Sequence, residues 1–295
     1  MRAPYTTDLA GVDAAVYGIP FDTATSFRTG PRFGPEAIRS ASALLRPYNP
    51  ALGVDVVETL SIVDYGDLPV SPGHTERTYG QVEEALAPLV EAGVFPLALG
   101  GDHSVTLAEL RVLARKHGAL SLVQLDAHGD TWEEYFGQRF FHGTTFKRAL
   151  EEKLIDPAAS VQAGLRGSLY GPEDLESARA LGFAVLPCDQ LRTLGPGGYS
   201  GIVRERVGRR PVFLSFDVDV LDPAFAPGTG TPEVGGLSTA EALACLRALA
   251  GIDLVGADVV EVSPPYDGPG QQTALAAANV AYELLSLRAL GQSAA

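Results

Sequence analysis

The sequence predicts an α/β fold in three layers, with helices on both faces of a mostly parallel sheet of about eight strands. Two observations support this prediction. Short apolar segments alternate with longer amphipathic ones along the whole chain of 295 residues, as they do where each strand is followed by a helix. The apolar segments are also nearly continuous, which is typical of strands buried on both faces. A closed barrel of parallel strands gives much the same pattern, and we rank it second.

Each predicted strand is a short apolar run bounded by polar residues, Gly or Pro. In chain order these runs are Ala14–Ile19, Leu60–Asp64, Phe95–Leu99, Leu120–Leu125, Val161–Leu165, Ala184–Leu186, Val212–Phe216 and Leu254–Val260. Each predicted helix is a longer amphipathic segment. The helices are Pro35–Leu45, Thr75–Ala92, Thr106–His117, Thr144–Lys153, Pro172–Leu181, Tyr199–Val207, Thr239–Ala250 and Thr273–Leu290. Two helices carry start signals: Pro35 stands in a first turn, and Ser238 with Glu241 forms a capping box.

The composition predicts a single domain that spans residues 1–295, because no repeat, low-complexity tract or composition shift marks a linker. A formal net charge of −14 disfavours nucleic acid and anionic membranes as partners. The two cysteines, Cys188 and Cys245, form no Cys-x-x-Cys motif, which fits a reducing cytoplasm. No segment has the roughly 20 apolar residues of a membrane span, and no secretion signal is recognisable. We therefore expect a cytoplasmic protein.

Histidines and aspartates follow directly after three of the predicted strands. They are His103 after Phe95–Leu99, Asp126, His128 and Asp130 after Leu120–Leu125, and Asp217 and Asp219 after Val212–Phe216. Side chains at alternate positions of extended chain share one side, and the carboxyl ends of parallel strands meet at one edge of a sheet. We therefore expect these side chains to converge. Taken alone, each cluster is equally consistent with turn-forming aspartates and buried structural histidines.

Together, these six side chains predict a site for two divalent metal ions. The first ion is assigned His103, Asp126, Asp130 and Asp217, and the second Asp126, His128, Asp217 and Asp219. Four carboxylates offset the charge of two divalent ions. One imidazole per ion among carboxylate oxygens favours Mn²⁺ over zinc. Two ions about 3.5–4 Å apart lower the pKa of a shared water, which predicts a hydrolase.

Three motifs resemble the signatures of the ureohydrolase family, which comprises arginase, agmatinase and their relatives. They are Gly-Gly-Asp-His at Gly100–His103, Asp-Ala-His-x-Asp at Asp126–Asp130, and Ser-Phe-Asp-Val-Asp-x-x-Asp-Pro at Ser215–Pro223. The resemblance extends from about Gly18 to the C-terminus. It implies a three-layer fold, two Mn²⁺ ions on the six ligands, and hydrolysis of a guanidino group to urea and an amine. It also implies a homo-oligomer, a trimer or hexamer.

The resemblance assigns three catalytic roles. His142 matches the family's proton-shuttling histidine, a task for which an imidazole pKa near 6.5 is suited, although a helix-start role is the alternative. Glu261 matches the glutamate that binds the guanidinium, because a carboxylate accepts paired hydrogen bonds from its planar N–H groups. Asp130 is expected to accept a hydrogen bond from the nucleophile and then to help protonate the leaving amine.

The choice of guanidino compound depends on the loops. Arginases have an asparagine where this chain has Trp132, which argues against free arginine. The segments Pro227–Glu233 and Ser263–Asp267 resemble the branch of agmatinases, guanidinobutyrases and proclavaminate amidinohydrolases. We expect Glu133, Glu134 or the face of Trp132 to bind the ammonium of agmatine, and Arg28 to bind the carboxylate of guanidinobutyrate.

The acidic chain favours agmatine, cleaved to putrescine and urea in polyamine biosynthesis, and guanidinobutyrate or another guanidino acid is the alternative. Outside this class, the alternatives are a metal-binding protein without turnover and a deacetylase-like hydrolase with one zinc ion. The number of bound ions separates the last alternative from the main prediction.

Overall fold

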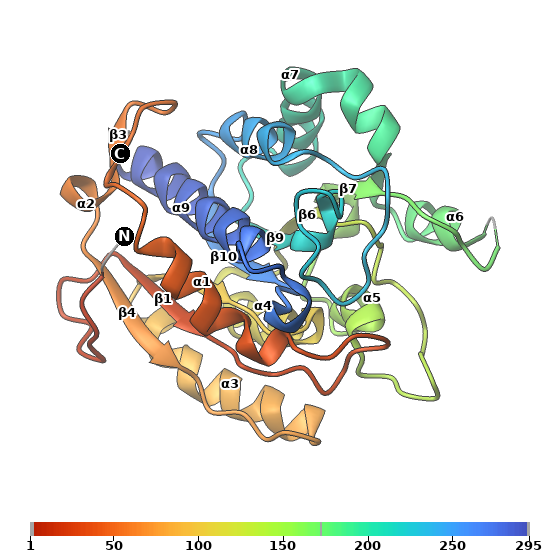
Figure 1. Cartoon of the computed structure of the whole chain (residues 1–295), viewed down its shortest axis with the longest axis horizontal. Helices are drawn as coiled ribbons and strands as arrows, with labels where there is room; N and C mark the ends of the chain where they lie inside the picture. Colours follow the sequence, from red (N-terminus) through yellow and green to blue (C-terminus); the bar gives the residue numbers. More distant parts are fainter. Residues whose placement is uncertain (1–2, 172, 294–295) are drawn as a thin grey trace.

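Eight parallel strands form the central sheet of this computed structural model, which describes residues 3–171 and 173–293 (Figure 1). Across the sheet the strands are β4 (Ile62–Asp67), β1 (Ala14–Gly18), β5 (Phe95–Leu99), β10 (Leu254–Val260), β9 (Val212–Asp217), β6 (Ser121–Leu125), β7 (Val161–Leu165) and β8 (Ala184–Pro187). Strands β4 and β8 form opposite edges, so the sheet is open. The three-layer prediction is confirmed, and the barrel is wrong.

Helices cover both faces of the sheet. Their bounds are α1 Gly34–Ser42, α2 Val56–Thr59, α3 Thr75–Glu91, α4 Thr106–His117, α5 Thr145–Glu151, α6 Glu173–Ala180, α7 Cys188–Val207, α8 Thr239–Arg247 and α9 Gln272–Ser293. Alternate residues of β9 point to opposite faces: Leu214 and Phe216 pack with α1, α7, α8 and α9, whereas Phe213 packs with α3, α4 and α5. Every residue of β9 is buried, as the continuous apolar run predicts.

Three details differ from the sequence prediction. Helix α7 begins at Cys188, and the predicted Tyr199–Val207 is its second half, separated by a break at Gly195, which has φ 63° and ψ 177°. A short hairpin of β2 (Tyr48–Asn49) and β3 (Val54–Asp55) precedes α2, and such two-residue strands have no detectable periodicity. The predicted helix Pro172–Leu181 corresponds to α6, and Pro172 itself lies outside the described residues.

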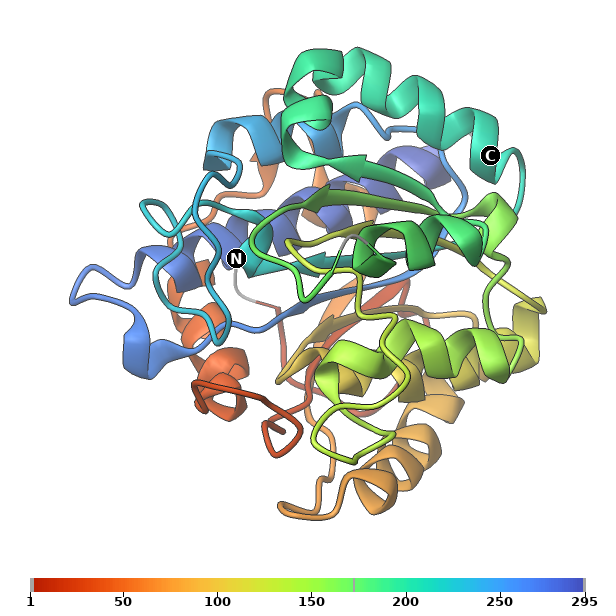
Figure 2. The ribbon, with the colours of Figure 1, turned by 90° about the vertical axis from the view of Figure 1, so that its right-hand side faces the viewer.

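The loops after the strands carry the predicted ligands. Figure 2, seen from the right-hand side of Figure 1, looks onto the loops that follow β1, β6, β7 and β9. Strands β5, β10, β9 and β6 are neighbours at the centre of the sheet, so the segments that follow them meet at one edge. Within the described part of the chain, no helix combines the length and apolar character needed to cross a membrane.

Candidate active site

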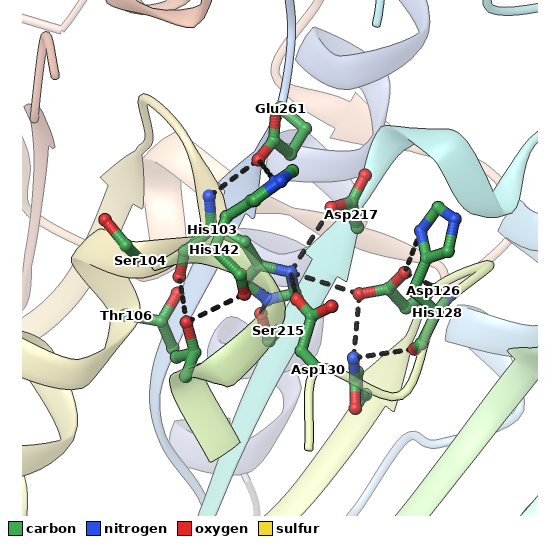
Figure 3. A network of polar contacts seen from close by, with 12 residues as sticks. His103, Ser104, Thr106, Asp126, His128, Asp130, His142, Ser215, Asp217 and Glu261 are labelled. Carbon is green, nitrogen blue, oxygen red and sulfur yellow. Dashed lines mark hydrogen bonds and ion pairs between the residues drawn. The ribbon is translucent and has the colours of Figure 1, made fainter. Parts of the chain in front are cut away.

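The first cluster surrounds His103, which begins the short 3-10 helix His103–Val105 after β5. Its Nδ1 atom lies 3.0 Å from Asp126 Oδ2, 3.0 Å from Asp130 Oδ2 and 3.2 Å from Asp217 Oδ2 (Figure 3). Nδ1 is buried and forms no hydrogen bond of ordinary geometry with a described residue, although three carboxylate oxygens surround it. Neighbouring ligand atoms in an octahedral shell of about 2.1 Å radius are ~3.0 Å apart. The four donors therefore fit a bound cation.

The second cluster surrounds His128. Its Nδ1 atom lies 3.0 Å from Asp219 Oδ2 and 3.6 Å from Asp126 Oδ1, so Asp126 belongs to both clusters. Two sets have the composition and spacing of metal ligands: His103 with Asp126 and Asp217, and His128 with Asp126 and Asp219. The structure places Asp217 with His103, where its Oδ1 also accepts a hydrogen bond of 2.8 Å from the Asp219 N–H. All six predicted ligands thus lie together, with Asp126 as the contact between the two clusters.

The electrostatics of these buried acids favour a bound cation. Burial raises the pKa of Asp217, and the Asp219 and Asp126 carboxylates raise it further. Burial also opposes ionisation of Asp126, but contacts with His103 and His128 hold the pKa of Asp126 well below its usual range. Despite burial, three aspartates raise the pKa of His103. The same potential that attracts a proton to this imidazole attracts a metal ion.

Backbone geometry explains two features of the motifs. A Cβ atom on Gly101 would overlap the carbonyl oxygen of Phe21 and lie 2.7 Å from that of Ile19, so only glycine allows the chain to pass there before His103. Asp130 and Glu261 have left-handed φ angles of 49° and 64°, which are unfavourable for residues with a side chain. Such strain is concentrated at functional sites.

Polar residues inside the strands support the ligands. Ser215 Oγ lies 2.8 Å from His103 Nε2 and donates a 2.7 Å hydrogen bond to Asp258 Oδ1. Nε2 therefore carries the ring proton, and Nδ1 keeps its lone pair for a metal. Gln124 Nε2 donates to Asp126 Oδ2 over 2.7 Å. Sequence reasoning missed these supporting residues, although a polar side chain in the middle of an apolar strand is the signal that identifies them.

His142 and Glu261 lie beside the first cluster (Figure 3). His142 Nδ1 is 3.0 Å from Glu261 Oε1, which also accepts a 2.9 Å hydrogen bond from the His103 N–H. Burial lowers the pKa of His142, but the hydrogen bond and charge of Glu261 raise it overall. Glu261 Oε2 is buried and accepts no hydrogen bond from a described residue.

A cavity of about 640 Å³ opens over the two clusters, and His128, Asp130, Asp217, His142 and Trp132 contribute to its lining. The Trp132 ring stacks on Tyr135, with centroids 4.9 Å apart and planes 8° apart. A cavity of this size, with aromatic walls and a few convergent polar groups, is typical of a small-molecule site.

Of the predicted substrate-binding residues, Trp132 lines this cavity, whereas Glu133, Arg28 and Glu261 do not. Glu133 forms ion pairs with Lys147, at 3.0 Å, and Arg148, at 3.3 Å. The Arg28 guanidinium lies over the ring of Tyr266, 4.9 Å from its centroid. The contacts of Glu133 and Arg28 with a substrate tail stay predictions.

Comparison with known proteins identifies the family. The model described as the Arginase family matches residues 12–286. The chain belongs to the arginase family. Guanidinobutyrase of Pseudomonas aeruginosa is 45% identical over 290 residues, 97% of this chain and 90% of the relative. Mitochondrial agmatinase of Gallus gallus is 43% identical over 287 residues, 97% of this chain and 81% of the relative.

The solved structure of proclavaminate amidinohydrolase from Streptomyces clavuligerus matches with a TM-score of 0.94 at 44% identity, covering 98% of this chain and 96% of that one. The predicted ureohydrolase family and its agmatinase-like branch are thereby confirmed. This arginase-family member is a hydrolase of guanidino compounds. Since the relatives are named for different substrates, the family alone does not decide which compound is cleaved.

Proposed function

We propose that this arginase-family hydrolase cleaves agmatine to putrescine and urea, with two Mn²⁺ ions per chain. The choice of agmatine rests on one observation: three acidic side chains of the cavity wall lack basic partners, whereas its arginines already have acceptors. Asp174, Asp189 and Glu233 line the cavity, and none of their carboxylates forms an ion pair with a described residue. Carboxylates without a basic partner favour an ammonium tail over a carboxylate tail.

The two arginines that line the cavity are already engaged. Arg166 donates to main-chain carbonyls, including those of Asp219 at 2.6 Å and Glu233 at 2.8 Å. Arg192 donates to the carbonyls of Gly235, at 3.1 Å, and Gly236. A carboxylate tail would have to displace these bonds, which costs free energy because it leaves partly buried main-chain carbonyls without their donors.

The proposed mechanism assigns each step to a named atom. The six histidine and aspartate ligands would hold the Mn²⁺ ions, whose Lewis acidity would make water acidic enough to act as a nucleophile near neutral pH. Glu261 Oε2 accepts hydrogen bonds from the guanidinium and orients its carbon. Asp130, which lines the cavity, accepts the proton of the attacking water and then passes it to the leaving amine. His142 holds a proton at Nδ1, beside Glu261, that the leaving amine requires.

Urea release tests this proposal. Purified protein loaded with Mn²⁺ is assayed side by side with agmatine, 4-guanidinobutyrate, 3-guanidinopropionate and arginine. We expect kcat/KM for agmatine to exceed that for each of the other compounds by about tenfold or more. The reason is that a tail of the wrong charge leaves the polar groups of the site without partners. Urea from none of the compounds would overturn the proposed activity.

The second candidate is 4-guanidinobutyrate, because the guanidinobutyrase of Pseudomonas aeruginosa is 45% identical to this chain. Glu233→Gln separates the two candidates. Loss of this carboxylate is expected to raise KM for agmatine and to leave KM for 4-guanidinobutyrate unchanged or lower, because the like charge is gone. A preference of the unaltered protein for 4-guanidinobutyrate would reverse our choice.

We further propose that the protein is cytoplasmic and assembles as a trimer or hexamer. Both cysteines are free thiols, which supports a reducing compartment. Sedimentation velocity measures the assembly: a single species at three or six times the chain mass is expected, and a monomer would contradict it.

A further inference from the structure

Ser26 contacts His142 twice. Its main-chain N–H donates to His142 Nε2 over 3.1 Å, and its Oγ lies 2.9 Å from the same nitrogen. Ser26 lies in the loop between β1 and α1 and contributes to the lining of the cavity. His142 itself is only 8% exposed. Both residues line the cavity, and the Ser26 hydroxyl is the group of the cavity wall that contacts Nε2 of this mostly buried imidazole.

Main-chain hydrogen bonds hold this arrangement in place. The His142 N–H donates to the Ala24 carbonyl over 3.0 Å, and the Ala24 N–H donates to Asp102 Oδ2 over 2.9 Å. Farther along the loop, the Gly30 N–H donates to Asp22 Oδ2 over 2.8 Å. None of these bonds uses the side chain of Ser26, so removal of its hydroxyl leaves the imidazole supported.

The contacts also fix the tautomer of His142. A main-chain N–H can only donate, so Nε2 is an acceptor. The ring proton is therefore on Nδ1, from which it is donated to Glu261 Oε1, 3.0 Å away. With Nε2 unprotonated, the Ser26 hydroxyl donates to it as well. One nitrogen of His142 thus faces the catalytic carboxylate and the other faces a hydroxyl at the cavity wall.

We propose that Ser26 Oγ relays protons between cavity water and His142 Nε2. In the inward step a water donates a proton to Oγ as the Oγ–H bond breaks and a new N–H bond forms at Nε2. The hydrogen bond from the Ser26 main-chain N–H to Nε2 breaks in the same step, because the protonated nitrogen no longer accepts. His142 then releases the Nδ1 proton toward the leaving amine, so one proton enters the imidazole and one leaves it. This inference rests on the proposed function, in which His142 supplies that proton.

The test compares Ser26→Ala with Ser26→Thr and with a neighbouring control. Ser26→Ala keeps the main-chain donor and removes only the hydroxyl. We expect kcat to fall about tenfold and KM to change less than about twofold. A tenfold loss is smaller than the rate enhancement of about 10²–10⁴-fold that a complete proton-transfer group contributes. Ser26→Thr retains a hydroxyl and is expected to recover kcat. The control Thr25→Ala removes the adjacent hydroxyl, which bonds the Asp22 carbonyl over 3.1 Å, and should resemble the unaltered protein.

Two further readouts separate a relay from a purely structural role. Added imidazole, which can enter the cavity, is expected to restore kcat of Ser26→Ala by about threefold or more without affecting Thr25→Ala. In a His142→Asn background, Ser26→Ala should cause no additional loss, because residues that act as one unit are not additive.

The inference is overturned if kcat of Ser26→Ala equals that of Thr25→Ala, or if the loss persists unchanged in the His142→Asn background. Failure of the Ser26 relay is distinguishable from failure of the proposed activity. The proposed activity fails only if the unaltered protein releases no urea from any guanidino compound.

Discussion

Ser215→Ala tests how the fold keeps His103 ready for a metal ion. The Ser215 hydroxyl is fully buried and joins two buried groups, His103 Nε2 at 2.8 Å and Asp258 Oδ1 at 2.7 Å. Asp258 retains the Thr106 hydroxyl, which donates to its Oδ2 over 2.6 Å. The imidazole, in contrast, loses its partner. An orphaned buried donor costs about 1–3 kcal/mol of folding free energy.

The same substitution weakens metal binding, because the ring is no longer held with Nδ1 toward the carboxylates. Loss of a residue that orients a metal-ligating histidine typically costs 10–100-fold in affinity. We therefore expect the Kd for Mn²⁺ to rise about 10–100-fold. The stabilisation that saturating metal adds to the fold should fall by about 1.4–2.7 kcal/mol at a fixed metal concentration.

Titration calorimetry with Mn²⁺ and thermal unfolding with and without metal measure both effects. Ser121→Ala is the matched control, since Ser121 is also fully buried in the sheet but its hydroxyl has no partner among the described residues. The control should leave metal affinity unchanged. If Ser215→Ala and Ser121→Ala bind Mn²⁺ equally well, the role assigned to the Ser215 bridge is refuted.

Three further predictions concern the cluster and the substrate carboxylate. Asp126→Asn should abolish binding of both ions, because both clusters share this residue; retention of one ion at full affinity, measured by elemental analysis, would contradict the shared position. Glu261→Gln should lower kcat/KM for agmatine about 100-fold in the urea assay while metal content stays constant, since a charge-assisted acceptor becomes neutral. Burial raises the pKa of Asp217 and of Asp130, so protons compete with Mn²⁺ for these carboxylates at a higher pH than for an ordinary aspartate, whose pKa is near 4. Calorimetry should therefore show that Mn²⁺ affinity falls as the pH is lowered from about 7 to about 5. An affinity that is constant over this interval would argue against that competition.

The sheet and the ligand cluster were accessible from the sequence for one physical reason. Strands buried on both faces require continuous apolar runs, so the end of each run shows where the carboxyl edge of the sheet lies. His103, Asp126 and Asp217 stand directly after such ends, and an open parallel sheet brings them together. The alternative of a closed barrel could not be rejected from the pattern, because edge strands such as β8 are distinguished only by what pairs with them.

The supporting residues and the substrate-tail residues depend on contacts between distant parts of the chain. Ser26 lies 116 residues before His142, and no local pattern indicates that they meet. Ser215 and Asp258 are isolated polar residues in apolar strands, and their role becomes apparent only from the hydrogen bond that they form between neighbouring strands. Glu133 and Arg28 were chosen by loop position, but nearby cations and the Tyr266 ring determine where those side chains point.

The central claim is that a guanidino compound is hydrolysed at a site that holds two Mn²⁺ ions. The most direct measurement is the rate of urea release from agmatine by metal-depleted protein as Mn²⁺ is added back and bound metal is counted. We predict that activity is absent without metal, rises with bound Mn²⁺ and reaches its plateau at two ions per chain. A plateau at one ion, a rate that does not depend on metal, or no urea at full loading would contradict the claim.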